Sequence, residues 1–76
     1  MTKATKAISQ QIKELRISNG LSQAALAESA GIDRKTINRI ERNHFSPSLD
    51  TLFRICVALN VQPNTFIKGI KVWVAQ

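Results

Sequence analysis

Residues 21–43, LSQAALAESAGIDRKTINRIERN, contain two short helical segments, one on either side of Gly31. The first follows Ser22, whose hydroxyl can cap the free N–H groups of a helix, and its run of alanine and leucine favours helix. Gly31 ends it, because glycine adopts backbone conformations that other residues avoid. The second begins at Asp33, an N-cap whose charge suits the helix dipole, and continues to about Arg42. Two short helices joined by a tight turn indicate a helix-turn-helix.

The second of these helices has a cationic side. At about 100° per residue, five of its polar side chains fall within an arc of about 140°. They are Arg34, Lys35, Asn38, Arg39 and Arg42. Four like charges on one face repel each other, and a bound polyanion would reverse the sign of that energy. Arginine can bond both major-groove acceptors of guanine, and asparagine can do the same for adenine. The alternative is a plain solvated face, which is common on helices, but the helix-turn-helix context favours nucleic acid.

Three further segments have helical spacing. The first carries an apolar stripe comprising Ala4, Ile8, Ile12 and Leu15 and ends near Asn19-Gly20. The fourth helix along the chain follows Ser48, and its expected apolar face comprises Leu49, Leu52, Phe53, Cys56 and Leu59. A short fifth helix starts at Pro63 and ends at Gly69. Residues 70–74 alternate and contain β-branched side chains, so they favour a short strand. The pattern predicts one all-α domain of five helices, with a possible C-terminal strand.

Composition narrows the function classes. The 76 residues carry 11 Lys and Arg against 5 Asp and Glu, a formal net charge of +6, which favours a nucleic-acid partner first and an anionic membrane surface second. One Cys and one His leave no disulfide within the chain and no multi-ligand Cys/His metal site. His44 stands alone and Cys56 is expected in the core, so neither catalysis nor a cofactor is expected. No apolar stretch reaches the ~20 residues that span a bilayer, and we expect a cytoplasmic protein.

The chain resembles the XRE family of helix-turn-helix regulators, which includes the lambdoid phage repressors and Cro proteins. The residues that carry the resemblance are Leu21-Ser22-Gln23-Ala24, Leu26-Ala27, Ala30-Gly31-Ile32, Thr36-Ile37, Ile40-Glu41-Arg42-Asn43, Pro47-Ser48-Leu49-Asp50-Thr51-Leu52, Ala58-Leu59 and Val61. Two positions depart from the family pattern: Ala25 replaces an acidic residue, and Asn60 stands where glycine is frequent. The resemblance covers roughly residues 8–69 and implies a single five-helix, lambda repressor-like domain.

The resemblance also implies roles for individual side chains. Base contacts are expected from Arg34, Lys35, Asn38 and Arg39, of which Asn38 could reach the DNA backbone instead. Phosphate contacts are expected from Ser22, Gln23, Thr36, Arg42, Asn43, His44 and Ser46. The resemblance also implies that Gln23 braces the recognition helix, although it could instead be a plain exposed residue. The helical angle of Thr36 favours packing. In relatives an arginine of the first helix pairs with a glutamate near the end of the third, so Arg16 and Glu41 are expected to form an internal ion pair.

The apolar tail is the second informative feature. A single helix-turn-helix reads few base pairs, so dimers on two half-sites are usual. Ile70, Val72, Trp73 and Val74 are candidates for the dimer contact, and folding back over the chain's own helices is an equal alternative. The predicted function is therefore sequence-specific binding of double-stranded DNA by a small dimeric transcriptional regulator, of the Cro-like repressor or restriction-modification controller type. It is expected to bind a palindromic operator through the third helix, with no small-molecule ligand. An antitoxin with a toxin partner, or a protein-interaction adaptor with the same fold, are the alternatives.

Overall fold

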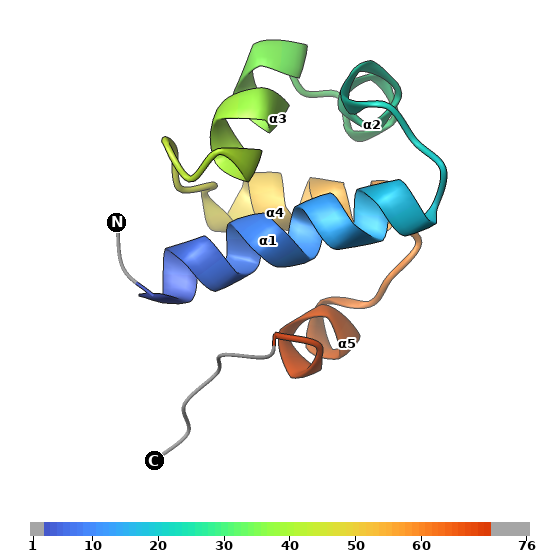
Figure 1. Cartoon of the computed structure of the whole chain (residues 1–76). Helices are drawn as coiled ribbons and strands as arrows, with labels where there is room; N and C mark the ends of the chain where they lie inside the picture. The colour runs from blue at the N-terminus through green and yellow to red at the C-terminus, as the bar shows by residue number, and fades with distance from the viewer. Residues whose placement is uncertain (1–2, 71–76) are drawn as a thin grey trace.

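The computed structural model describes residues 3–70, which form five α-helices (Figure 1). They are α1 (Lys3–Ser18), α2 (Gln23–Ala30), α3 (Arg34–Glu41), α4 (Leu49–Ala58) and α5 (Pro63–Lys68). The all-α prediction is confirmed, and residues 3–70 contain no strand. Apart from Ile70, which belongs to no helix or strand, the predicted C-terminal strand lies outside the described residues. No helix within residues 3–70 has both the length and the apolar character needed to cross a membrane.

The helix starts follow the predicted serine caps. The Ser22 hydroxyl accepts the backbone N–H of Ala25 at 3.0 Å, and the Ser48 hydroxyl accepts that of Thr51 at 3.1 Å. Each cap satisfies one of the four free N–H groups at a helix N-terminus. Asp33 occupies the predicted N-cap position of α3, but its side chain makes no capping hydrogen bond there. The Asp33 side chain therefore stabilises that end of α3 only through the interaction of its negative charge with the helix dipole.

The first four helices end in the same backbone motif. A residue in the left-handed conformation follows each of them, namely Gly20, Gly31, Asn43 and Asn60, with φ of 70°, 68°, 60° and 57°. The next N–H then returns to a carbonyl five residues back: Leu21 to Arg16, Ile32 to Ala27, His44 to Arg39 and Val61 to Cys56, at 2.8–3.1 Å. This Schellman geometry satisfies carbonyls that a helix end leaves unpaired, and it favours glycine and asparagine at the left-handed position.

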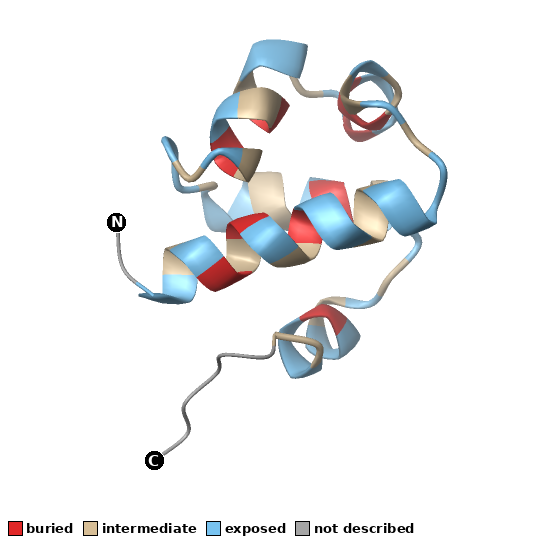
Figure 2. Cartoon of the chain, in the orientation of Figure 1, coloured by how far each residue is buried: buried red, intermediate tan, exposed pale blue. Residues whose placement is uncertain are grey.

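The core draws at least one fully buried side chain from every helix (Figure 2). These side chains are Ile12, Leu26, Ile37, Ile40, Ile55, Cys56 and Phe66. Two of them, Ile37 and Ile40, lie on α3, so the inner side of that short helix is fixed by packing. The prediction that Cys56 is a core residue is confirmed, and Phe66 is fully buried as well.

The prediction for the apolar face of α4 is wrong in part. Leu52, Cys56 and Leu59 face the core, but Leu49 is 70% exposed and Phe53 is 50% exposed. Phe53 lies about 100° around the helix from Leu52, outside the arc that the buried residues of α4 occupy. A smaller correction applies to α1, where Ala4 is exposed and Ala7 is buried instead.

Candidate nucleic-acid interface

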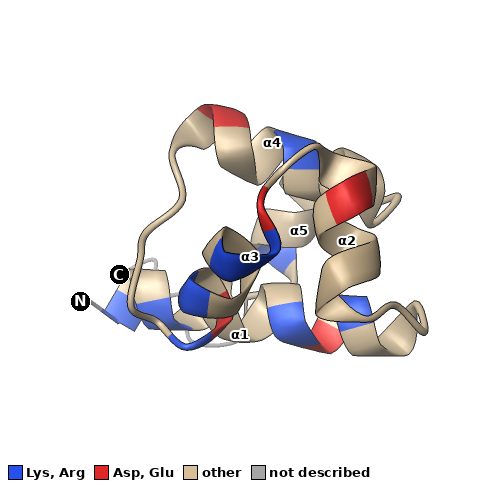
Figure 3. Ribbon diagram, turned by 90° about the horizontal axis from the view of Figure 1, so that it is seen from above, with Lys and Arg blue, Asp and Glu red and all other residues tan. Residues whose placement is uncertain are grey.

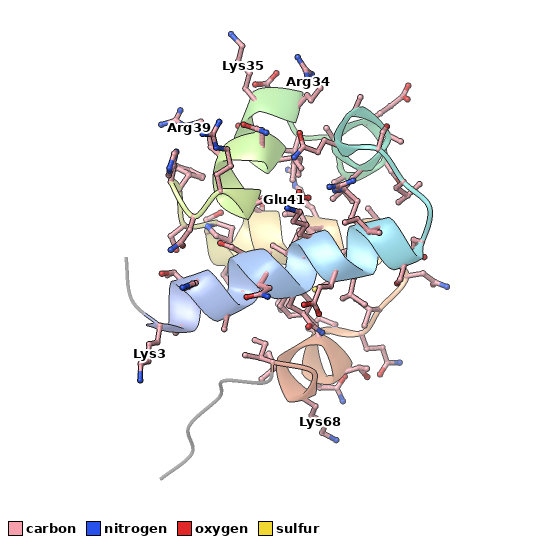
Figure 4. All side chains as sticks on the ribbon, in the orientation of Figure 1. Lys3, Arg34, Lys35, Arg39, Glu41 and Lys68 are labelled. Atoms are coloured by element: carbon pink, nitrogen blue, oxygen red, sulfur yellow. The ribbon has the colours of Figure 1, made fainter. Side chains whose placement is uncertain are left out.

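Helix α3 presents its cations away from the body of the molecule. Arg34, Lys35 and Arg39 are exposed, whereas Ile37 and Ile40 on the opposite side of the helix are fully buried. Figure 3 shows the basic ribbon of α3 on the face that is turned to the viewer. In Figure 4 the three cations project outward and Glu41 points inward. None of the three is tucked beneath a neighbouring helix, so a duplex can reach all of them.

The inner end of α3 is held by a polar network that starts at Glu41. The Glu41 side chain is 2% exposed. Its Oε2 accepts a hydrogen bond from Arg16 Nε at 2.6 Å, and its Oε1 accepts one from Arg16 Nη2 at 3.0 Å. Gln23 Nε2 donates to Glu41 Oε1 at 3.1 Å, and Gln23 Oε1 in turn accepts from Asn38 Nδ2 at 3.1 Å. Arg16 also donates to the Leu21 carbonyl at 2.8 Å. The expected Arg16–Glu41 pair therefore forms, and it extends through Gln23 to the edge of the cationic side.

This network sets the local electrostatics. Hydrogen bonding to Glu41, reinforced by the negative charge of that carboxylate, raises the pKa of Arg16, although partial burial opposes the shift. Arg16 therefore stays charged, and its bidentate geometry is the strongest form of such a pair. The positive charge of Arg16 compensates the negative charge of Glu41, so the carboxylate does not offset the positive charges on the outer side of α3. Every buried polar side-chain atom within residues 3–70 has a hydrogen-bond partner.

The exit of α3 carries the remaining candidate residues. Arg42, His44 and Ser46 are exposed, so they can reach a phosphate. Asn43 is half-buried, and its backbone is in the left-handed conformation. Its Oδ1 lies 3.4 Å from the Ser9 hydroxyl of α1, which donates at the shorter distance of 2.9 Å to the Thr5 carbonyl. Thr36 is half-buried, which agrees with the packing alternative. Within residues 3–70 no group of His, Cys, Asp and Glu side chains could hold a metal ion.

Comparison with known proteins identifies the family. A family model described as helix-turn-helix matches residues 12–66. The chain belongs to the XRE-type helix-turn-helix family. It is 39% identical over 67 residues to the HTH-type transcriptional regulator SutR of Escherichia coli K12, covering 88% of this chain and 38% of SutR. It is 37% identical over 60 residues to the immunity repressor protein of Bacillus phage phi105, covering 79% of this chain and 42% of the repressor.

A solved structure extends the likeness to three dimensions. The chain superposes with a TM-score of 0.88 and 28% identity on the restriction-modification controller protein C.Esp1396I, in a tetramer bound to its natural 35 base-pair operator. That match covers 92% of each chain. The chain thus spans about two fifths of the length of SutR and of the phage repressor, but nearly all of the controller protein.

Two side-chain contacts bear on the roles predicted for this helix-turn-helix. The bracing role that the resemblance implies for Gln23 agrees with its hydrogen bonds to Glu41 and Asn38 of α3, whereas the bond between Gln23 and Asn38 themselves was not predicted. Phe45, in the loop after α3, is 41% exposed, and the Arg39 guanidinium carbon lies 5.8 Å from the centre of its ring. The glutamine at position 23 is the sequence signal for the contacts with Glu41 and Asn38. The contact between Phe45 and Arg39 depends instead on the path of the chain after α3.

Proposed function

We propose that this protein is a sequence-specific transcriptional regulator that binds double-stranded DNA by placing α3 in the major groove. The observation that carries the proposal is the division of α3, whose inner side is fixed by Ile37, Ile40 and the Glu41 network while three cations project outward. A major groove about 12 Å wide admits one such helix. The controller and repressor proteins to which the chain is similar support the same function.

Each side chain has a distinct task in this proposal. Arg34, Lys35 and Arg39 read base edges, with guanine as the preferred target of a bidentate arginine. Arg42, His44 and Ser46 at the exit of α3 neutralise or bond phosphates, as does the N-terminal end of α2 at Ser22 and Gln23. Binding occupies the operator without chemical catalysis, and no cofactor or small-molecule ligand takes part.

A second copy of the chain completes the site, because one α3 reads too few base pairs for a specific operator. The outer side of α4 is the surface that we propose for this contact. Leu49, Phe53 and Val57 lie four residues apart on it, and they are 70%, 50% and 78% exposed. They continue the buried face of α4 around the helix, and Phe53 and Val57 line a shallow groove against α2.

Charge and position favour a twofold partner on this surface. Asp50 and Arg54 flank the apolar stripe and pair with each other at 3.2 Å, so each can face its opposite charge across antiparallel α4 helices. Seen from the side of α3, α4 lies at the edge of the molecule (Figure 3), so a partner there leaves both α3 helices uncovered. Half-sites one turn apart, about 34 Å, place each α3 about 17 Å from the twofold axis. The extents of 37 × 23 × 21 Å allow this spacing.

DNA binding is tested by selecting duplexes from a random pool and titrating the selected duplex with salt. A dimer that contacts about eight phosphates gives a slope of log K against log[salt] near −7. Arg39→Ala should cost about 1–3 kcal/mol and relax preference at one base pair. Lys68→Gln is the charge control, since Lys68 lies at the opposite end of the molecule from α3 in Figure 4. A chain that selects no sequence, as an adaptor would, contradicts the proposal.

The dimer surface is tested separately by sedimentation. Val57→Glu should shift the chain toward monomer, because it places a charge in the proposed apolar contact. The fold of the single chain should tolerate the change, since Val57 is 78% exposed there. Ile17→Glu, on an exposed apolar residue of α1, is the matched control. A chain ending at Gly69 tests the alternative in which the tail forms the contact. If that truncation yields monomer while Val57→Glu does not, the α4 surface is wrong.

A further inference from the structure

Phe45 is a large apolar side chain that the fold leaves uncovered beside the cationic side of α3. It is 41% exposed, and it is not among the side chains that pack against the core. Its ring lies 5.8 Å from the guanidinium carbon of Arg39, within the roughly 6 Å over which a cation is attracted to an aromatic face. Among the described residues 3–70, this is the one cation–aromatic contact.

The helix ends show that this arrangement differs from ordinary packing. After α1, α2 and α4, the residue that follows the left-handed position is apolar and packs against the core; these residues are Leu21, Ile32 and Val61. Such an apolar contact commonly accompanies the Schellman motif. At the end of α3 the same place is taken by His44, which is exposed. The apolar residue comes one position later, and it meets Arg39 rather than the core.

The backbone holds Phe45 in this place. The His44 N–H donates to the carbonyl of Arg39 itself at 2.8 Å, so the chain turns back beside Arg39 immediately before Phe45. Asn43, which makes the turn, is half-buried, and its Oδ1 lies 3.4 Å from the Ser9 hydroxyl of α1. The ring is therefore attached to a short, hydrogen-bonded segment.

A ring in this position limits the freedom of one reading side chain. An exposed arginine samples many rotamers and loses side-chain entropy when it is fixed in one of them. Contact with the ring of Phe45 removes part of that freedom before DNA arrives, and preorganisation of this kind raises affinity. Neither Arg34 nor Lys35 has such a contact within residues 3–70.

We propose that Phe45 is a specificity-determining residue that positions Arg39, so that the base pair facing Arg39 is read more stringently than those facing Arg34 and Lys35. This inference rests on the proposed function, since it presupposes that Arg39 contacts a base. Phe45 itself acts through Arg39.

The experiment measures the discrimination of single base pairs. The probe is the duplex that the wild-type chain selects from a random pool, together with its single-base variants. The base pair read by Arg39 is the one at which Arg39→Ala loses preference. Phe45→Leu should lower discrimination there about two- to fivefold, the range expected for an exposed cation–aromatic contact. Phe45→Tyr, which keeps the ring, should stay within about twofold of wild type.

Three results would overturn the inference. Phe45→Leu could weaken binding equally at all positions, which would show that the ring packs against the DNA backbone. It could leave every preference unchanged, or it could have the same effect in an Arg39→Ala background. In each case the selected sequence still exists, so the proposed function survives. If the wild-type chain selects no sequence, the proposed function fails and this inference fails with it. Thermal melting of Phe45→Leu confirms that the variant is folded.

Discussion

Removing Glu41 should destabilise the fold strongly, although its helix is only eight residues long. The Glu41 carboxylate accepts two hydrogen bonds from Arg16 and one from Gln23, and its side chain is 2% exposed. Glu41→Leu leaves the Arg16 guanidinium, 12% exposed, without its counter-charge. Breaking a buried pair by removing one partner costs about 3–5 kcal/mol.

The structure favours the lower end of that range. Arg16 keeps its hydrogen bond to the Leu21 carbonyl and has some access to water, so part of its charge stays solvated. We therefore expect Glu41→Leu to cost about 3 kcal/mol, which for a domain of this size lowers the melting temperature by roughly 12–24 °C. Glu14→Gln, which removes the charge of an exposed carboxylate on α1, is the control and should change the stability by less than about 0.5 kcal/mol.

A double-mutant cycle separates the pair from general disruption. The variant Arg16→Met with Glu41→Leu replaces both charges by apolar side chains, and such replacements of buried pairs are often close to neutral. We expect it to be at least about 2 kcal/mol more stable than the sum of the two single changes predicts. The measurement is urea unfolding followed by circular dichroism. Additivity within about 0.5 kcal/mol, or a Glu41→Leu cost below about 1 kcal/mol, would refute the reasoning.

Three further outcomes can be measured on the same protein. Gly31→Ala should cost about 1–2 kcal/mol in urea unfolding, because Gly31 has φ of 68° and an added Cβ meets no atom closer than 3.9 Å, so strain alone decides. Ser48→Ala removes the cap of α4 and should cost about 1 kcal/mol by the same assay. Burial raises the pKa of the Cys56 thiol, so it should react with a disulfide reagent only through unfolding. The pKa of the Cys56 thiol is higher in the folded chain than in the unfolded chain. The contribution of the buried thiol to the free energy of unfolding is therefore complete below about pH 8.5 and is lost as the pH rises further.

Helix positions could be predicted because their ends are locally coded. Ser22 and Ser48 act through contacts three residues away, and Gly31 acts through its own backbone, so neither needs knowledge of the fold. Asn60 looked like a departure from the family pattern, since glycine is frequent there. The structure shows why asparagine serves: with φ of 57° the position needs a residue that tolerates the left-handed conformation.

The outer side of α4 could not be predicted in the same way. Leu49, Phe53 and Val57 have the same spacing as core residues, and helical periodicity does not state how wide an arc the neighbouring helices will cover. Whether such residues are core or interface depends on contacts between helices that are far apart in sequence. The position of Phe45 beside Arg39 could not be predicted either. It depends on the turn at Asn43 and not on a periodic pattern in the sequence.

The two sides of α3 connect the stability of the fold to the reading of DNA. Ile37, Ile40 and Glu41 fix the helix from within, whereas Arg34, Lys35 and Arg39 are free of structural duties apart from the contact with Phe45. Substitutions on the outer side should therefore change DNA preference at nearly constant stability. Gln23 and Asn38 belong to both sides, because their hydrogen bond joins the buried carboxylate network to the reading face. Variants of Gln23 and Asn38 should change both the free energy of unfolding and the DNA preference. This joint change distinguishes them from variants of Arg34, Lys35 and Arg39, which should change the DNA preference alone.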